Sequence, residues 1–403
     1  MKLRSDLAFL PLDDEVVAFS EQVQRLVGLN ASAAHVARRV AAGAPFSAIA
    51  RELAENGLTS ADEAENWISV TLDALRSQGM LADAPVPEQG VSEEIRSQEE
   101  QQARRVATMP SYSPIEAVAE RRYRLLNTVA VMRFGMHEQA QAVDAALGHL
   151  AAADDAEPTA LVEVQASVLG NRGSIRSNIY LDRQPAEFAT GLHRLAPAVK
   201  SLFWGLAVNS YDFLFYIHAG AVGRGDGRCV LLPAAAGSGK SSMTAALVHR
   251  GYRYLSDEVA LIEPTSFRVP PVPLAVCIKS SGVEVMRRYF PDILEIRSHQ
   301  RMDGKHVRYV PVAPSTLQRA SARVSHIVFP RYKAARATQI HPIARSTALR
   351  RMMSECWACG HLDHANVAEL IRWIGQIDCY ELTFSSLERA ADLVQQVAPL
   401  ESA

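Results

Sequence analysis

A short apolar segment followed by a glycine-rich loop with one lysine most constrains how this chain can fold. Residues 228–232 are largely apolar and predict a buried strand, and residues 243–250 have helical character and stop at Gly251. The loop between them contains Gly237, Ser238, Gly239, Lys240, Ser241 and Ser242. A strand, a loop of this composition and a helix in that order predict a phosphate-binding loop.

The residue types in this loop suit a nucleoside triphosphate. Glycines let backbone N–H groups turn inward around phosphates, and the positive end of the following helix points at them. We expect Lys240 to reach the β- and γ-phosphates and the Ser241 hydroxyl to hold Mg²⁺. Ala234 stands where such loops usually carry their first glycine, which costs little if its φ is negative. The sequence therefore predicts a nucleotide, taken as ATP with GTP left open, and Mg²⁺.

Two adjacent carboxylates follow soon after the loop. Asp257 and Glu258 stand just ahead of an apolar run at residues 259–262. Neighbouring carboxylates suit phosphoryl transfer, because one can orient or deprotonate an acceptor hydroxyl while the other helps to hold Mg²⁺. The alternative for Glu258 is a solvated charge at the end of a strand. Farther on, Lys279 and Arg308 either neutralise phosphate charge or are ordinary surface charges.

Residues 212–262 resemble the HPr kinase/phosphorylase family. The resemblance is carried by the segment Ile217, His218, Ala219 and Gly220, by the loop 237–241, and by Ser256, Asp257, Glu258 and Val259. It implies a P-loop α/β kinase domain in which Asp257 is the acid/base residue and His218 lies near the transferring phosphate. This assignment leaves Glu258 as the carboxylate that would help Ser241 to hold Mg²⁺. A structural hydrogen-bonding role is the alternative for His218.

The chain also departs from that family. Ser242 stands where the family commonly has Glu after the loop, and Glu258 stands where it has a second Asp. The C-terminal signature associated with phosphorolysis is not found. The resemblance therefore implies a kinase, and it leaves open both the reverse reaction and the HPr protein as substrate.

Residues 1–84 form a separate unit in the sequence. Short strands over 9–29 precede helices that we expect over 31–42, from Pro45 to residue 56, and from Thr59 or Ser60 to residue 78. Asn30 can cap the first helix. The unit resembles the winged-helix-like PqqD-type domain that recognises the leader of a precursor peptide, which implies a peptide added as a strand beside the small sheet.

A DNA-binding winged helix is the competing interpretation of this unit. Residues 31–84 carry the basic residues Arg38, Arg39, Arg51 and Arg76 against seven acidic residues. Because a duplex is densely negative, this balance disfavours nucleic acid as a partner.

The rest of the chain divides by composition. Residues 85–114 contain several prolines and a run dense in Glu, Gln, Ser and Arg, which predicts a flexible linker that is partly helical in its middle. Residues 115–210 then form the N-terminal part of the kinase region and residues 211–403 the P-loop domain. We expect strands at 129–132, 160–169 and 174–181, with a turn at 170–173, and helices at 138–152 and 192–207.

Global composition limits the cellular setting. The 403 residues carry a net charge of −2, five cysteines at irregular spacing, and no N-terminal basic segment followed by an apolar core. These features predict reduced thiols, no secretory signal and no membrane partner, hence a cytoplasmic protein. The oligomeric state, a homo-oligomer included, stays open.

One cluster of potential metal ligands needs a separate interpretation. Cys356, Cys359, His361 and His364 lie within nine residues. Zinc modules usually separate their ligand pairs more widely so that they converge tetrahedrally, so we interpret this segment as a partly buried helix end.

The sequence as a whole predicts an α/β kinase that phosphorylates a hydroxyl, taken as Ser, on a precursor peptide held through its leader. Two alternatives remain. An NTPase driving another step of peptide maturation would release phosphate without labelling an acceptor, and a regulatory nucleotide-binding protein would show no turnover.

Overall fold

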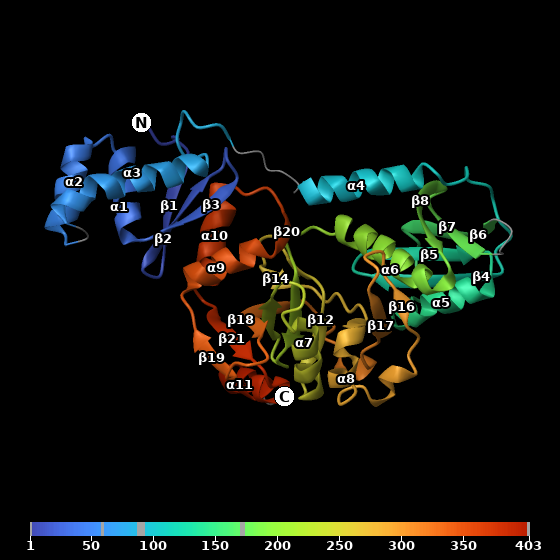
Figure 1. Cartoon of the computed structure of the whole chain (residues 1–403). Helices are drawn as coiled ribbons and strands as arrows, with labels where there is room; N and C mark the ends of the chain where they lie inside the picture. Colours follow the sequence, from blue (N-terminus) through green and yellow to red (C-terminus); the bar gives the residue numbers. More distant parts are fainter. Residues whose placement is uncertain (1, 58–59, 87–92, 170–173, 401–403) are drawn as a thin grey trace.

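The computed structural model describes residues 2–57, 60–86, 93–169 and 174–400 and is a mixed α/β structure (Figure 1). A small N-terminal unit and the sheet of residues 119–190 lie on opposite sides. The C-terminal region with the glycine-rich loop joins them. Within the described ranges no helix is both long enough and apolar enough to cross a membrane.

The N-terminal unit is an antiparallel sheet covered by helices. Its strands, in the order β1-β2-β3, and its helices are β1 (Leu7–Leu12), β2 (Glu15–Ser20), β3 (Arg25–Leu29), α1 (Ala31–Ala41), α2 (Phe46–Glu55) and α3 (Ala61–Ser77). Asn30 caps α1 as predicted, because its side chain accepts a hydrogen bond from the N–H of Ala33 at 2.8 Å. The Ser60 hydroxyl precedes α3 but donates to the Glu63 carboxylate instead, and Thr59 lies outside the described residues.

The predicted linker contains α4 (Glu93–Val106), and the second half of this helix is packed rather than free. Gln102 donates a hydrogen bond of 2.8 Å to the Glu187 carboxylate, and Arg105 forms an ion pair of 3.1 Å with the same group. These contacts hold α4 against the last strand of the neighbouring sheet (Figure 1). The helical middle of the linker is confirmed.

The second sheet has the order β4-β5-β6-β7-β8, in which β5 and β6 are parallel. Its elements are β4 (Ala119–Leu125), β5 (Thr128–Phe134), α5 (His137–Leu147), β6 (Ala160–Leu169), β7 (Ser174–Leu181), β8 (Gln184–Thr190) and α6 (Leu192–Asn209). The helix predicted to reach residue 152 ends at Leu147 and continues as a single 3₁₀ turn, Gly148–Leu150. The turn predicted at 170–173 lies outside the described residues.

The C-terminal region is built around a mixed sheet in the order β12-β10-β11-β18-β21-β19, with β14 also paired to β18. Its strands are β10 (Ala219–Gly223), β11 (Arg228–Pro233), β12 (Arg253–Ser256), β14 (Arg268–Val269), β18 (Ala322–Tyr332), β19 (Gln339–Pro342) and β21 (Asp378–Phe384). Its helices are α7 (Lys240–His249), α9 (Arg345–Ser354), α10 (His364–Ile374) and α11 (Leu387–Val397). The predicted strand, loop and helix are present as β11, residues 234–239 and α7.

Two small sheets flank this main sheet. One has the order β13-β9-β20 and consists of β9 (Phe215–Ile217), β13 (Ala260–Ile262) and β20 (Cys356–Cys359). The other has the order β15-β17-β16 and consists of β15 (Val276–Lys279), β16 (His299–Gln300) and β17 (His306–Val310), with the short helix α8 (Val283–Met286) beside it. The interpretation of residues 356–364 as a helix end is therefore partly wrong, because Cys356–Cys359 is a strand and α10 begins only at His364.

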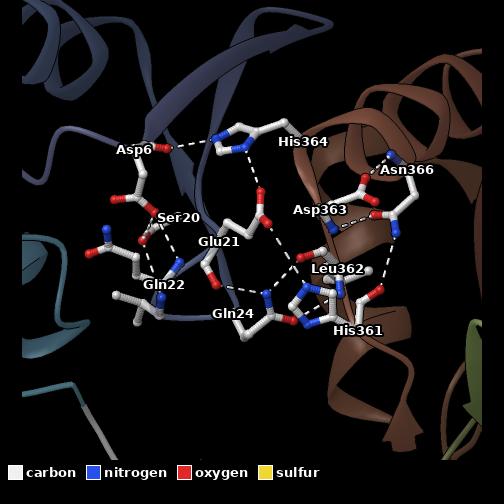
Figure 2. Close-up of polar contacts among 11 residues, drawn as sticks. Asp6, Ser20, Glu21, Gln22, Gln24, His361, Leu362, Asp363, His364 and Asn366 are labelled. Atoms are coloured by element: carbon white, nitrogen blue, oxygen red, sulfur yellow. Dashed lines mark hydrogen bonds and ion pairs between the residues drawn. The ribbon is translucent and has the colours of Figure 1, made fainter.

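The N-terminal unit docks on the C-terminal region through α10 (Figure 2). The Gln24 side chain donates to the Leu362 carbonyl at 2.6 Å and accepts from the Leu362 N–H at 2.8 Å. The two ring nitrogens of His364 contact the Glu21 carboxylate at 2.8 Å and the Asp6 carbonyl at 2.7 Å. Of the four potential metal ligands, Cys356 and Cys359 belong to the strand β20, and His361 and His364 lie at the interface with the N-terminal unit.

Apolar packing reinforces the same interface. Leu12, Val17 and Phe19 of the N-terminal sheet belong to one buried cluster with residues of the C-terminal region, and Phe19 is fully buried. The N-terminal unit is therefore docked on the C-terminal region, although the composition of residues 85–114 predicts a flexible linker. The apolar residues that make this contact alternate along the strands. From the sequence, such residues could equally belong to the core of the N-terminal unit itself.

Candidate functional site

Two glycines of the glycine-rich loop adopt a backbone conformation that other residues rarely adopt. Gly237 and Gly239 both have a φ of 89°, and Gly239 is the N-cap of α7. A Cβ on Gly239 would also lie 2.6 Å from Cζ of Phe384, so a side chain at this position would be strained in its backbone and would force the Phe384 ring to move. Ala234 does not adopt a positive φ, which explains why alanine replaces the usual glycine there.

A cavity of about 520 Å³ opens in front of this loop and brings the predicted site residues together. Its lining includes His218, Gly237, Gly239, Lys240, Ser241, Ser242, Asp257 and Glu258. Ser238 does not line it; the Ser238 carbonyl accepts a hydrogen bond from the Tyr332 N–H at 3.0 Å, which ties the loop to β18. Of the two additional cations considered, Lys279 lines the cavity, whereas Arg308 donates to the Ile296 carbonyl at 3.0 Å outside it.

Lys240 and Asp257 are both buried in this cavity, and each has a polar atom without a hydrogen-bond partner among the described residues. These atoms are Nζ of Lys240 and Oδ1 of Asp257. Burial lowers the pKa of Lys240 to about 8 despite the nearby Asp257, and burial raises the pKa of Asp257 to about 6 despite Lys240. Desolvation therefore outweighs their mutual attraction, and a phosphate anion beside Lys240 would satisfy its ammonium.

Asp257 follows the end of a strand, which the sequence did not indicate. β12 ends at Ser256 and β13 starts at Ala260, so the two carboxylates lie in the short connection between them. Oδ2 of Asp257 accepts a hydrogen bond from the Cys277 N–H at 3.3 Å, and the Ser241 hydroxyl also interacts with this carboxylate. The Oδ1 atom keeps no hydrogen-bond partner among the described residues. Ser241, at the start of α7 and beside a carboxylate, fits the predicted role of a Mg²⁺ ligand.

Glu258 is engaged by two cations. Its Oε2 lies 2.6 Å from Nζ of Lys200 in α6, and its Oε1 lies 3.9 Å from the Arg301 guanidinium. Burial raises the pKa of Glu258, but the charge and hydrogen bond of Lys200, together with the Arg301 and Lys240 charges, outweigh burial and leave this pKa lowered. A carboxylate held in this way has fewer lone pairs for Mg²⁺, so the metal-ligand role predicted for Glu258 stays a prediction that this geometry disfavours.

His218 lines the cavity between Lys240 and an aromatic side chain. Its ring stacks on Trp357 of β20 at 4.7 Å, and its Nδ1 lies 3.7 Å from the Glu355 carboxylate. Burial, followed by the Lys240 charge, lowers the pKa of His218 to about 4. The ring is therefore neutral near pH 7 and can only exchange hydrogen bonds with a phosphate or an acceptor.

Sequence reasoning missed three residues in or beside the cavity that matter to this arrangement. Lys200 of α6 pairs with the cavity residue Glu258. Arg301, in the connection between β16 and β17, and Trp357 of β20 line the cavity. None lies near the loop in sequence and none belongs to a recognisable motif. Only the fold brings them to Glu258 and His218.

A second cavity, of about 700 Å³, lies between β3 and α3 of the N-terminal unit. Trp67 and Val70 of α3 line it and expose 38% and 60% of their surfaces. Within the described chain β3 pairs only with β2, so its other edge is free to accept a further strand. Arg350 of α9 lies at the same cavity and is its only charged lining residue in the described ranges.

Comparisons with known proteins give partial likenesses. No family model matches the chain, and no curated protein matches it. A solved structure described as "TbiB1 in Complex with the TbiA(beta) Leader Peptide" is 21% identical, with a TM-score of 0.20, and the match covers 21% of this chain and 99% of that chain. The HPr(Ser) kinase/phosphatase from Coxiella burnetii is 13% identical, with a TM-score of 0.21, and the match covers 45% of this chain and 92% of that chain. At these TM-scores the likenesses carry no weight for function, and the chain is similar in part to each of these two proteins.

Proposed function

We propose that this chain is a kinase that transfers the γ-phosphoryl group of ATP to a serine hydroxyl of a precursor peptide. The observation that carries the proposal is the pair Lys240 and Asp257, buried in one cavity with their polar atoms unpartnered. A cation and a base facing the same space beside a glycine-rich loop is what phosphoryl transfer requires.

Each residue has a definite task in this proposal. The loop N–H groups and Lys240 bind the phosphates. Asp257 accepts the proton of the acceptor hydroxyl while the hydroxyl oxygen bonds to the γ-phosphorus. The bond from the γ-phosphorus to the bridging oxygen breaks, and this oxygen leaves with ADP. Mg²⁺, held by Ser241, would neutralise charge on the phosphates. With its pKa raised to about 6, Asp257 is mostly ionised near pH 7 and is a stronger base than an exposed aspartate.

The N-terminal cavity supports a peptide as the acceptor. An extended peptide can add to the free edge of β3 and place alternate side chains against Trp67 and Val70 of α3. A nucleic acid would meet Arg350 as the only cation among the described lining residues, so the groove suits a peptide better.

A direct test is to incubate the full chain with Mg²⁺, ATP labelled at the γ-phosphorus and a library of serine-containing peptides. Label on the peptides, lost when serine is replaced by alanine, supports the proposal. Free labelled phosphate without peptide labelling would indicate an NTPase, and neither product would indicate a regulatory nucleotide-binding protein.

A further inference from the structure

Lys200 is a buried lysine outside the nucleotide-binding loop and outside the C-terminal region. It lies in α6, which packs beside β16, and only 4% of its surface is exposed (Figure 1). Lysine is almost never fully buried unless it is paired. A lysine buried to this extent therefore needs a partner that compensates its charge.

The surroundings of the Lys200 ammonium hold it in one place. Nζ lies 2.6 Å from Oε2 of Glu258, 5.4 Å from the ring centroid of Trp204 and 5.3 Å from that of Tyr309. Two aromatic faces and a carboxylate surround the charge, which is the arrangement that stabilises a desolvated cation. Burial lowers the pKa of Lys200, but the charge and hydrogen bond of Glu258, together with the Cys277 thiolate, outweigh burial and leave this pKa raised.

Glu258 is in turn fixed from both sides. Its Oε1 faces Arg301, whose guanidinium also lies 3.6 Å from Asp303. Glu258 lines the nucleotide cavity and is joined to Asp257 by one peptide bond. A buried ion pair adds little net stability compared with apolar residues of similar size, so stability alone is a weak reason for Lys200.

We propose that Lys200 is a positioning residue of the nucleotide cavity: by holding Glu258, it keeps the adjoining Asp257 directed at the acceptor. This inference rests on the proposed kinase function. It also gives a role to the 115–210 unit, whose helix α6 supplies the cation that pairs with Glu258 of the cavity.

The remaining contacts of this unit support that role. Arg194 at the start of α6 donates to the Gln300 side chain of β16 at 3.0 Å, and His149 contacts the Pro273 carbonyl at 2.9 Å. Val259 and Leu261, on either side of the β13 start, belong to the apolar cluster that includes Phe203 of α6. Residues of α6 thus pack against the chain directly after Asp257 and Glu258 and support the connection that carries them.

The experiment measures Mg·ATP turnover as phosphate release, nucleotide affinity with a fluorescent ATP analogue, and melting temperature in the full chain. Lys200→Met should lower kcat by about tenfold or more while the affinity for the analogue changes less than about threefold. Lys200→Arg keeps the charge and should recover part of kcat. A purely structural lysine would change melting temperature without this split between kcat and affinity.

A double substitution tests whether Lys200 acts through Glu258. Lys200→Met should add no further loss of kcat on a Glu258→Gln background. The double variant leaves no unpaired charge of this pair buried, so it can still be measured if Lys200→Met alone does not fold. Equal losses of kcat on both backgrounds, or full kcat in Lys200→Met, would overturn the inference while the kinase proposal stands. No turnover of ATP and no peptide labelling by the unaltered chain would overturn both.

Discussion

Lys240 and Asp257 lie buried in one cavity and each keeps a polar atom unpaired among the described residues. Leaving a buried polar group without a partner costs about 1–3 kcal/mol, and more if it is charged. Such a cost is tolerated at a site where a ligand supplies the missing partners. At the scale of single residues, these two side chains are therefore the first to test.

Lys240→Ala should lower turnover by about 100-fold to 1000-fold, because it removes a preorganised cation from a water-poor site. The measurement is the rate of phosphate transfer or release from Mg·ATP. Lys2→Ala, which alters an exposed lysine of the N-terminal unit, is the matched control and should leave the rate unchanged. Full activity in Lys240→Ala would exclude the glycine-rich loop as the phosphate site.

Asp257→Asn should retain nucleotide binding and lose transfer by at least about 100-fold, because the amide keeps the shape but cannot accept the hydroxyl proton. Binding of a fluorescent ATP analogue and single-turnover transfer separate the two effects. If affinity and transfer fell together, Asp257 would be a structural residue or a metal ligand instead of the base.

At the scale of elements, β20 and the start of α10 connect the cavity at the glycine-rich loop with the N-terminal unit. Trp357 of β20 stacks on His218 in this cavity, and seven residues later His364 contacts the N-terminal unit. Both His364 ring nitrogens face acceptors, so only the protonated ring can donate at both contacts. Backbone contact with Asp6, followed by Glu21, raises the pKa of His364 above 6.5.

This raised pKa predicts pH-dependent docking. A histidine whose pKa is raised in the docked state contributes fully below its free pKa and loses that contribution as pH rises through the raised value. Glu21, Asp6 and the nearby His361 are the titratable groups around the ring. Small-angle scattering should therefore give a larger radius of gyration at pH ~8 than at pH ~6.

His364→Gln is the control for this prediction. The amide can serve one contact at any pH, so the radius of gyration of this variant should change less between the two pH values. The Gln24 contacts with Leu362 carry no titratable group and should persist in both forms. Equal pH responses of the two proteins would place the titrating group elsewhere.

At the scale of the whole molecule, docking replaces a loose tether with a defined geometry. The groove between β3 and α3 is held on the C-terminal region by buried Val17 and Phe19 and by the ion pair of Asp13 with Arg345 at 3.0 Å. A peptide bound there is held on the same molecule as the loop cavity, so we expect an effective concentration of roughly millimolar for an acceptor segment joined by a short connection.

Val70→Asp should therefore raise KM for a groove-binding acceptor peptide by about tenfold or more while kcat changes little. Val70 exposes 60% of its surface, so the fold should tolerate the charge. Val118→Asp, at a valine with 46% exposure outside both cavities, is the matched control. Steady-state kinetics at varied peptide concentration check the effect, and unchanged KM would assign the groove to another partner.

Local sequence patterns determined a large part of this protein. The strand, glycine loop and helix around Lys240, the cap at Asn30 and the hairpin strands of residues 160–181 follow from short-range spacing and backbone preference. These features depend on neighbours a few residues apart, and such neighbours are visible in one sequence.

Only the tertiary structure decided which distant residues meet those motifs. Lys200 reaches Glu258 from 58 positions away, and Gln24 reaches Leu362 from 338 positions away. A buried lysine and an exposed lysine look alike in a helical pattern, because burial depends on what the fold places against them. The sequence alone thus determined the strand, glycine-rich loop and helix and the two acids that follow, while the pairing of Glu258 and the docking of the N-terminal groove depend on long-range packing that has no local signature.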